Sequence, residues 1–115
     1  MHELAVCQAL LTEVRRAVAA DAGPVTRIVV RVGPLAGVEP RLLARAFEFA
    51  RAGGIAAEAE LVVESGPVRI ECLECRAQAD TPPNRLTCPR CGALRTRLVS
   101  GDELLLQRVE YRAAA

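Results

Sequence analysis

Residues Glu71 to Gly92, ECLECRAQADTPPNRLTCPRCG, contain two CxxC pairs that stand twelve residues apart. The first pair is Cys72 and Cys75, and the second is Cys88 and Cys91. Each pair places two sulfurs on one tight turn, so a hairpin between the pairs can bring four thiolates together. Four thiolates favour a tetrahedral Zn²⁺ with no open coordination position, and such a site is structural.

Two other interpretations of these cysteines stay open. Either CxxC pair alone could be a redox dithiol, although thioredoxin-like chemistry normally places one such pair at a helix start after a strand. Four thiolates also bind iron, as in a rubredoxin-like site. Two matching pairs in an irregular region favour the structural zinc site.

The region around the cysteines cannot support its own hydrophobic core. It lacks a long periodic apolar pattern and is interrupted by three prolines, so apolar burial cannot offset its ordering entropy. We therefore expect residues 71–98 to form a zinc-ribbon module inserted between strands. Residues 1–70 and 99–115 are expected to form the larger domain.

Outward from the module, apolar periodicity predicts a small α+β domain of the α/β type. A period near 3.6 predicts helices from Leu4 to about Asp21 and from Pro40 to the glycines at 53 and 54. Alternating β-branched and polar residues predict strands at 26–32, 60–65 and 103–112. The expected fold is two helices on a three-stranded mixed sheet, with the four-cysteine ribbon inserted.

Charge gives little support to a nucleic-acid partner. Lys+Arg 15 against Asp+Glu 14 leaves a formal net charge of +1, which produces no strong field for steering. Residues 69–98 hold six arginines and three acids, and a Zn²⁺ with four thiolates would reduce their net charge to about +1. No aromatic residue in this region could stack on a base.

The chain is expected to be cytoplasmic and without a membrane partner. No apolar run approaches the ~20 residues of a membrane span, and the N-terminus lacks the pattern of a signal peptide. In a reducing compartment, paired cysteines are metal ligands more often than disulfides. The fifth cysteine, Cys7, lies on the apolar face of the first predicted helix and is interpreted as a small buried hydrophobe.

His2 is the only histidine of the chain. The Met1 α-amine, the deprotonated amide nitrogen of His2 and its Nδ1 can form two fused chelate rings on one metal ion. Strong in-plane nitrogen donors suit a square-planar Ni(II) or Cu(II), not a tetrahedral Zn²⁺. By itself, a histidine at this position is weak evidence for a metal site.

Together with the cysteines, several further motifs make the chain resemble the HypA/HybF family of hydrogenase-maturation proteins. The resemblance covers nearly the whole chain, in order. It is carried by Met1-His2-Glu3-Leu4, Val32-Gly33 with Leu35 and Val38-Glu39-Pro40, Val68-Arg69-Ile70 before the cysteines, and Gly101-Asp102-Glu103-Leu104 after them.

The resemblance implies a non-catalytic nickel metallochaperone that helps to deliver Ni²⁺ into the nickel-iron hydrogenase large subunit. It implies His2 as the nickel ligand, with Met1 and Glu3 as auxiliary donors, and a HypB-type nickel GTPase and the large-subunit precursor as partners. The zinc ligands that it implies are Cys72, Cys75, Cys88 and Cys91. The alternative is a zinc-ribbon nucleic-acid-binding or scaffold module with no nickel function.

Overall fold

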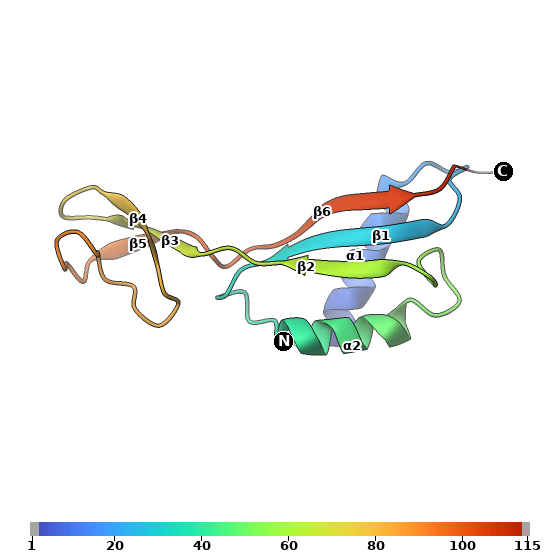
Figure 1. The fold of residues 1–115 in the computed structure, drawn as a ribbon, viewed down its shortest axis with the longest axis horizontal. Helices are drawn as coiled ribbons and strands as arrows, with labels where there is room; N and C mark the ends of the chain where they lie inside the picture. The colour runs from blue at the N-terminus through green and yellow to red at the C-terminus, as the bar shows by residue number, and fades with distance from the viewer. Residues whose placement is uncertain (1–2, 114–115) are drawn as a thin grey trace. The chain divides into compact units, whose positions relative to one another are not determined.

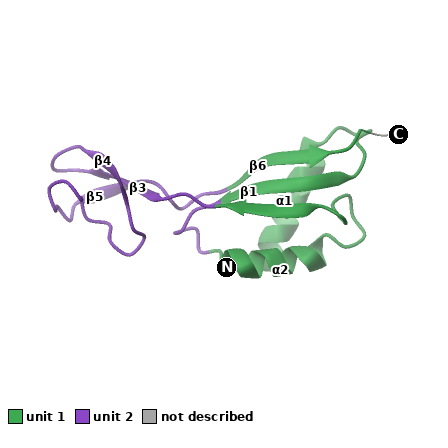
Figure 2. Ribbon diagram, viewed as in Figure 1, with its two compact units in different colours: residues 1–31, 38–64, 105–115 green, residues 32–37, 65–104 purple. Residues whose placement is uncertain are grey.

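The structure, a computed structural model, describes residues 3–113, in which two helices and six strands are divided between two units (Figures 1 and 2). Unit 1 contains Met1–Arg31, Val38–Glu64 and Leu105–Ala115, and unit 2 contains Val32–Gly37 and Ser65–Leu104. No helix within the described part of the chain is long and apolar enough to cross a membrane.

Unit 1 is built on a three-stranded sheet in the order β2-β1-β6. Its strands are β1 (Val25–Val32), β2 (Glu60–Glu64) and β6 (Leu104–Tyr111). β1 and β2 run parallel. Backbone hydrogen bonds join Gly23 and Pro24, just before β1, to Arg112, just after the end of β6, so β1 and β6 run antiparallel. The sheet is therefore mixed, as the sequence predicts.

Two helices cover the sheet of unit 1 because each has one apolar face. They are α1 (Glu3–Ala17) and α2 (Pro40–Ala50), and they pack against each other, with α1 behind the sheet and α2 alongside β2 in Figure 1. Pro40 occupies the first turn of α2, where its missing N–H costs nothing. The Glu39 carboxylate caps the same turn by accepting a 2.9 Å hydrogen bond from the Leu42 N–H.

Unit 2 contains a second three-stranded sheet in the order β4-β3-β5, all antiparallel. Its strands are β3 (Val68–Cys72), β4 (Gln78–Thr81) and β5 (Thr96–Ser100). Val68, Ile70 and Cys72 alternate along β3 and are fully buried on one face. Within residues 65–104, Val68 and Ile70 are the only fully buried aliphatic side chains, so the apolar core of this unit is very small.

The sequence-based description needs two corrections. It places residues 65–70 in the larger domain, but β3 pairs on both sides with β4 and β5, and the smaller unit contains Ser65–Leu104 together with Val32–Gly37. It also continues both helices too far, since the first was expected to reach Asp21 and the second the glycines at 53 and 54. In the structure α1 ends at Ala17 and α2 at Ala50, and separate turns follow them, closed by the Ala22 N–H to Ala19 carbonyl bond and the Gly54 N–H to Arg51 carbonyl bond.

Two glycines, Gly33 and Gly101, allow two backbone segments of unit 2, 32–37 and 101–103, to approach closely. A Cβ on Gly33 would collide with the backbone carbonyl of Gly101, and Gly101 itself has φ +128, a conformation that favours glycine. The Leu35 N–H donates to the Gly101 carbonyl at 2.7 Å, and the Gly33 N–H donates to Glu103 at 2.8 Å. These hydrogen bonds hold the segment 32–37 against the segment 101–103.

We predict that the core of unit 1 depends on Leu43, which is 0% exposed on α2. Leu43→Ala should lower the free energy of unfolding by about 2–5 kcal/mol, because it leaves a cavity among packed aliphatic side chains. Leu42→Ala is the matched control, since Leu42 is 49% exposed and its truncation should change stability by only about 0.5 kcal/mol. Urea unfolding followed by far-UV circular dichroism measures both, and equal destabilisation would contradict the assigned packing.

Candidate metal centre

The structure brings the four cysteine sulfurs of unit 2 together. The Sγ atoms of Cys72, Cys75, Cys88 and Cys91 all lie within 4.8 Å of one another. Cys72 is the last residue of β3, and Cys75 follows on the turn between β3 and β4. The second pair lies on a similar turn between β4 and β5.

The two CxxC turns repeat the same hydrogen bonds. The backbone N–H of each second cysteine donates to the first sulfur, at 3.3 Å from Cys75 to Cys72 and at 3.4 Å from Cys91 to Cys88. The residue after each second cysteine has positive φ, which is 64 at Arg76 and 78 at Gly92. Glycine adopts this conformation without strain, whereas the turn holds Arg76 in a conformation that is sterically strained for a residue with a Cβ.

The spacing of the sulfurs fits a tetrahedral metal ion. A tetrahedral Zn²⁺ with Zn–S bonds of about 2.3 Å separates its sulfurs by about 3.8 Å. The Cys72 and Cys91 sulfurs are 3.6 Å apart, and those of Cys75 and Cys88 are 3.7 Å apart. With four ligands from the protein, such a site leaves no position for a substrate.

The backbone donors prepare the first cysteine of each pair for binding a cation. The N–H of Cys75 lowers the pKa of Cys72, and the N–H of Cys91 lowers the pKa of Cys88 to about 6, although burial opposes both shifts. The Ala93 N–H lowers the pKa of Cys91, but the adjacent Cys72 sulfur, burial and the Cys88 sulfur together raise it to about 12. The four crowded thiols therefore need a bound cation before all of them can be deprotonated.

The residues that the sequence assigns to the N-terminal metal site are placed only in part. Met1 and His2 lie outside the described residues. Glu3 is the first residue of α1, and its Oε2 accepts a 3.4 Å hydrogen bond from the Glu39 N–H. Unit 1 therefore contains Glu3, whereas the four cysteines lie in unit 2.

Cys7 is separate from both sets. It is 0% exposed, and its thiol donates to the Leu43 carbonyl at 3.5 Å. Burial raises the pKa of Cys7, and the nearby Glu3 carboxylate adds to the increase. A buried thiol that keeps its proton is a poor metal ligand, so its interpretation as a packed hydrophobe is confirmed.

The sequence predicts backbone amides that point toward the thiolates, because a small residue such as Gly92 after the second cysteine allows it, and the N–H groups aimed at Cys72 and Cys88 confirm this. Sequence reasoning missed the left-handed Arg76, which occupies the position of Gly92 in the first turn. The repeat of CxxC followed by one residue and alanine, at Ala77 and Ala93, marks the second turn as a copy of the first. The N–H groups of Cys72 and Cys88 donate to the carbonyls of these two alanines.

Comparison with known proteins identifies a single family. Residues 1–111 match the family described as "Hydrogenase/urease nickel incorporation, metallochaperone, hypA". The chain is 40% identical over 111 residues to hydrogenase maturation factor HypA of Nitrosospira multiformis and 38% identical over 111 residues to that of Aquifex aeolicus, with 96% of each chain covered in both alignments. The solution structure of the nickel metallochaperone HypA from Helicobacter pylori matches with a TM-score of 0.69 at 27% identity, over 98% of this chain and 99% of that chain.

We predict one tightly bound metal ion per chain, and zinc in particular, in the purified protein. Cys88→Ala should release this ion, because three thiolates leave an open and weaker site. Cys7→Ala is the matched control, since it removes a cysteine outside the cluster and should retain the metal. Elemental analysis measures both variants, and a Cys88→Ala protein with full metal content would contradict the assignment.

Proposed function

Because the chain belongs to the HypA family of hydrogenase and urease nickel-incorporation metallochaperones, we propose that it binds Ni(II) at its N-terminus and helps to deliver it into the nickel-iron hydrogenase large subunit. The match over residues 1–111 is the observation that carries this proposal, and it confirms the resemblance drawn from the sequence. A family of metallochaperones carries an ion and does not transform a substrate, so no catalytic residue is assigned.

The proposed nickel site is formed by the Met1 α-amine, the His2 amide nitrogen and the His2 Nδ1. Three nitrogens in one plane favour Ni(II) over Zn²⁺. The fourth donor is then a backbone group, water, a partner or the Glu3 carboxylate. One oxygen of that carboxylate faces the Glu39 N–H at 3.4 Å, which leaves the other oxygen for the metal.

The position of Glu3 supports an N-terminal site that is anchored to the domain. Its hydrogen bond to the Glu39 N–H lies just before α2, where the Glu39 side chain caps the helix. The residues that would hold the ion therefore directly precede, in the sequence, a helix whose first residue is hydrogen-bonded to the cap of α2. Cys7, one turn further along α1, is buried and gives no competing soft ligand.

The second metal of the proposal is a structural zinc ion held by Cys72, Cys75, Cys88 and Cys91. It would supply a cross-link between two turns, and no chemistry at an open position. The sulfur separations of 3.6 and 3.7 Å and the repeated N–H donors support this assignment. The protein would thus use nitrogen donors for its cargo and sulfur donors for its structure.

We propose a HypB-type nickel GTPase and the hydrogenase large-subunit precursor as partners in the cytoplasm. A donor must present its ion to the acceptor, so the surface around the start of α1 is the natural docking region. Glu3 is partly exposed there, and Gln8, Arg15 and Arg16 are exposed along the same helix. The Arg15 guanidinium is held by a 3.1 Å hydrogen bond to the Thr12 hydroxyl.

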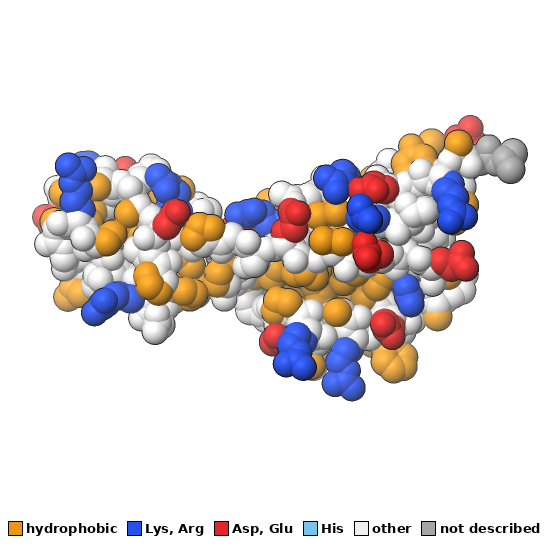
Figure 3. All heavy atoms as spheres, in the orientation of Figure 1, with side chains coloured by type: hydrophobic (Ala, Val, Ile, Leu, Met, Phe, Trp, Pro, Cys, Tyr) orange, Lys and Arg blue, Asp and Glu red, His pale blue; other side chains and the backbone are white. Residues whose placement is uncertain are grey.

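The charges of unit 2 favour this function over a nucleic-acid-binding ribbon. Three of its arginines pair with its three acids nearest the cysteines, as Arg69 with Asp80, Arg95 with Glu74, and Arg97 with Glu71. Figure 3 shows the blue side chains on this face of the unit scattered among orange and white atoms, not gathered into one basic patch. Phosphate binding needs several unpaired cations along one track.

We predict that His2→Ala abolishes stoichiometric nickel binding and leaves zinc content and the helical signal unchanged, because it removes only the imidazole. A residue added before Met1 should weaken nickel binding as well, because it converts the α-amine into a peptide nitrogen. Nickel binding should weaken as the pH falls, since protons compete for an imidazole of ordinary pKa about 6.5 and an amine of about 8.

Nickel calorimetry on zinc-loaded, untagged protein tests this prediction. The matched control is a C-terminal extension without histidines, which should bind nickel as the parent protein does. Equal nickel stoichiometry and affinity in the parent and His2→Ala proteins would refute the N-terminal site.

A further prediction concerns the partner surface. Reversing the charge of Arg15 and Arg16 together should weaken binding of the GTPase by about tenfold, because both guanidinium groups lie exposed on α1. Reversal of Arg41 and Arg45 on α2 is the matched control and should change affinity less. Equal affinity of the Arg15 and Arg16 variant and the parent protein, measured by calorimetry at fixed salt, would exclude α1 as the interface.

A further inference from the structure

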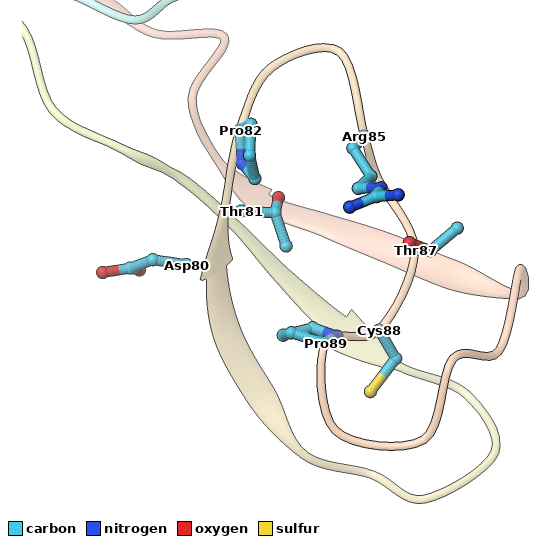
Figure 4. A pocket seen from close by; sticks show the side chains of 7 residues that line it. All are labelled: Asp80, Thr81, Pro82, Arg85, Thr87, Cys88 and Pro89. Carbon is cyan, nitrogen blue, oxygen red and sulfur yellow. The ribbon is translucent and has the colours of Figure 1, made fainter.

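The loop between β4 and the second CxxC turn borders an open pocket outside the sulfur cluster. Its volume is about 370 Å³, and its walls include Thr81, Pro82, Arg85 and Pro89 (Figure 4). The Arg85 N–H donates to the Pro82 carbonyl at 3.1 Å, which closes the turn that carries Arg85. The metal-ligand role of the cysteines accounts for none of these side chains.

Thr81 places an unsatisfied hydroxyl in this pocket. The residue is only 7% exposed, and its Oγ1 has no hydrogen-bond partner among residues 3–113. Figure 4 shows the hydroxyl directed between Pro82 and Arg85. A buried hydroxyl without a hydrogen-bond partner destabilises the folded protein, so a hydrogen bond from this hydroxyl to a ligand in the pocket would be favourable.

Arg85 supplies a positive charge across from this hydroxyl. In Figure 4 one terminal nitrogen of its guanidinium lies on the side of Thr81, and the guanidinium makes no ion pair or hydrogen bond within the described part of the chain. By contrast, Arg69, Arg95 and Arg97 of the same unit each pair with an acid. The pocket is therefore lined by both an unpaired cation and an unpaired hydroxyl.

These two groups suit a carboxylate ligand. A guanidinium offers two parallel N–H donors that match the two oxygens of a carboxylate, and the Thr81 hydroxyl can donate a third hydrogen bond. The rings of Pro82 and Pro89 provide apolar walls for a short carbon stem. Asp80, which also borders the pocket, points away in Figure 4 and pairs with Arg69 at 3.0 Å.

A doubly charged phosphate fits this pocket less well. A single guanidinium cannot balance two negative charges, and Cys88 forms part of the wall. A divalent metal with four thiolates carries a net charge of −2 and would repel a dianion more strongly than a monoanion.

We propose that this pocket of unit 2 binds a carboxylate on a short apolar stem, with the Arg85 guanidinium and the Thr81 hydroxyl as its donors. Both a free small carboxylic acid and a glutamate side chain of a partner protein have this chemistry. The site is independent of the proposed nickel site, because it lies in unit 2 and uses neither His2 nor Glu3.

Amide NMR of the metal-loaded full chain tests the proposal, with butyrate as the probe and uncharged butyramide as its isostere. Butyrate should shift the Thr81 and Arg85 resonances in a saturable manner with roughly millimolar affinity, and butyramide should not. Arg85→Gln should weaken butyrate binding by about tenfold or more, and Thr81→Val by a smaller factor. Arg90→Gln is the matched control, since this arginine is exposed in the same unit but does not line the pocket.

A second pair of probes distinguishes the two sources of the carboxylate. A blocked glycine peptide with one central glutamate should shift the same resonances if a partner side chain is the ligand, and its glutamine counterpart should not. Binding of butyrate alone would support a free acid. The absence of saturable shifts, or equal shifts with butyramide, overturns the proposal. Tighter binding of inorganic phosphate than of butyrate also overturns it. So does a loss of butyrate affinity in Arg90→Gln as large as that in Arg85→Gln, with both variants carrying the same metal content as the parent protein.

Discussion

The structure of residues 65–104 depends on four sulfurs that must stay within 4.8 Å of one another. Val68 and Ile70 are the only fully buried aliphatic side chains of this segment, and each such side chain contributes only about 1.5–3 kcal/mol on burial. Ordering each residue costs about 1–2 kcal/mol in backbone entropy, so this apolar core cannot order the segment by itself. A metal ion held by Cys72, Cys75, Cys88 and Cys91 would supply the missing cross-link.

This requirement separates the two metals of the proposed function. A structural ion needs a closed set of ligands, and the four thiolates of unit 2 provide one. A cargo ion must be released, so it suits a site with fewer protein donors at the end of the chain. The chain joins the two units through the segments near Gly33 and Gly101, where a side chain on either glycine would meet the backbone of unit 2. A side chain at either glycine would therefore disturb the backbone packing of unit 2.

The elements of unit 1 could be predicted because their patterns are long. Six of the eight residues of β1 are β-branched, and Pro40 with the apolar face of α2 marks the second helix. The sheet of unit 2 could not be predicted in the same way. β4 has only four residues, Gln78–Thr81, with little β-branched character, and it is stabilised by pairing with β3. The alternation of Val68, Arg69 and Ile70 in the sequence does not say which strands β3 pairs with.

Only part of the candidate site could likewise be predicted from the sequence. Cysteine spacing predicted the four clustered sulfurs, because ligand type and spacing are properties of the sequence. The left-handed Arg76 and the buried Thr81 hydroxyl could not be predicted, because both result from the path of the folded backbone. Nothing in the residue types at these positions distinguishes them from ordinary turn and strand residues.

Residue-resolved hydrogen exchange, before and after removal of the metal by a chelator, tests most directly whether the four sulfurs hold unit 2 together. The account predicts that the amides of β3, β4 and β5 lose their protection when the metal leaves, whereas those of α1, α2 and β1 keep theirs. Continued protection of β3 to β5 in the metal-free protein would contradict the account, as would a simultaneous loss of protection throughout both units.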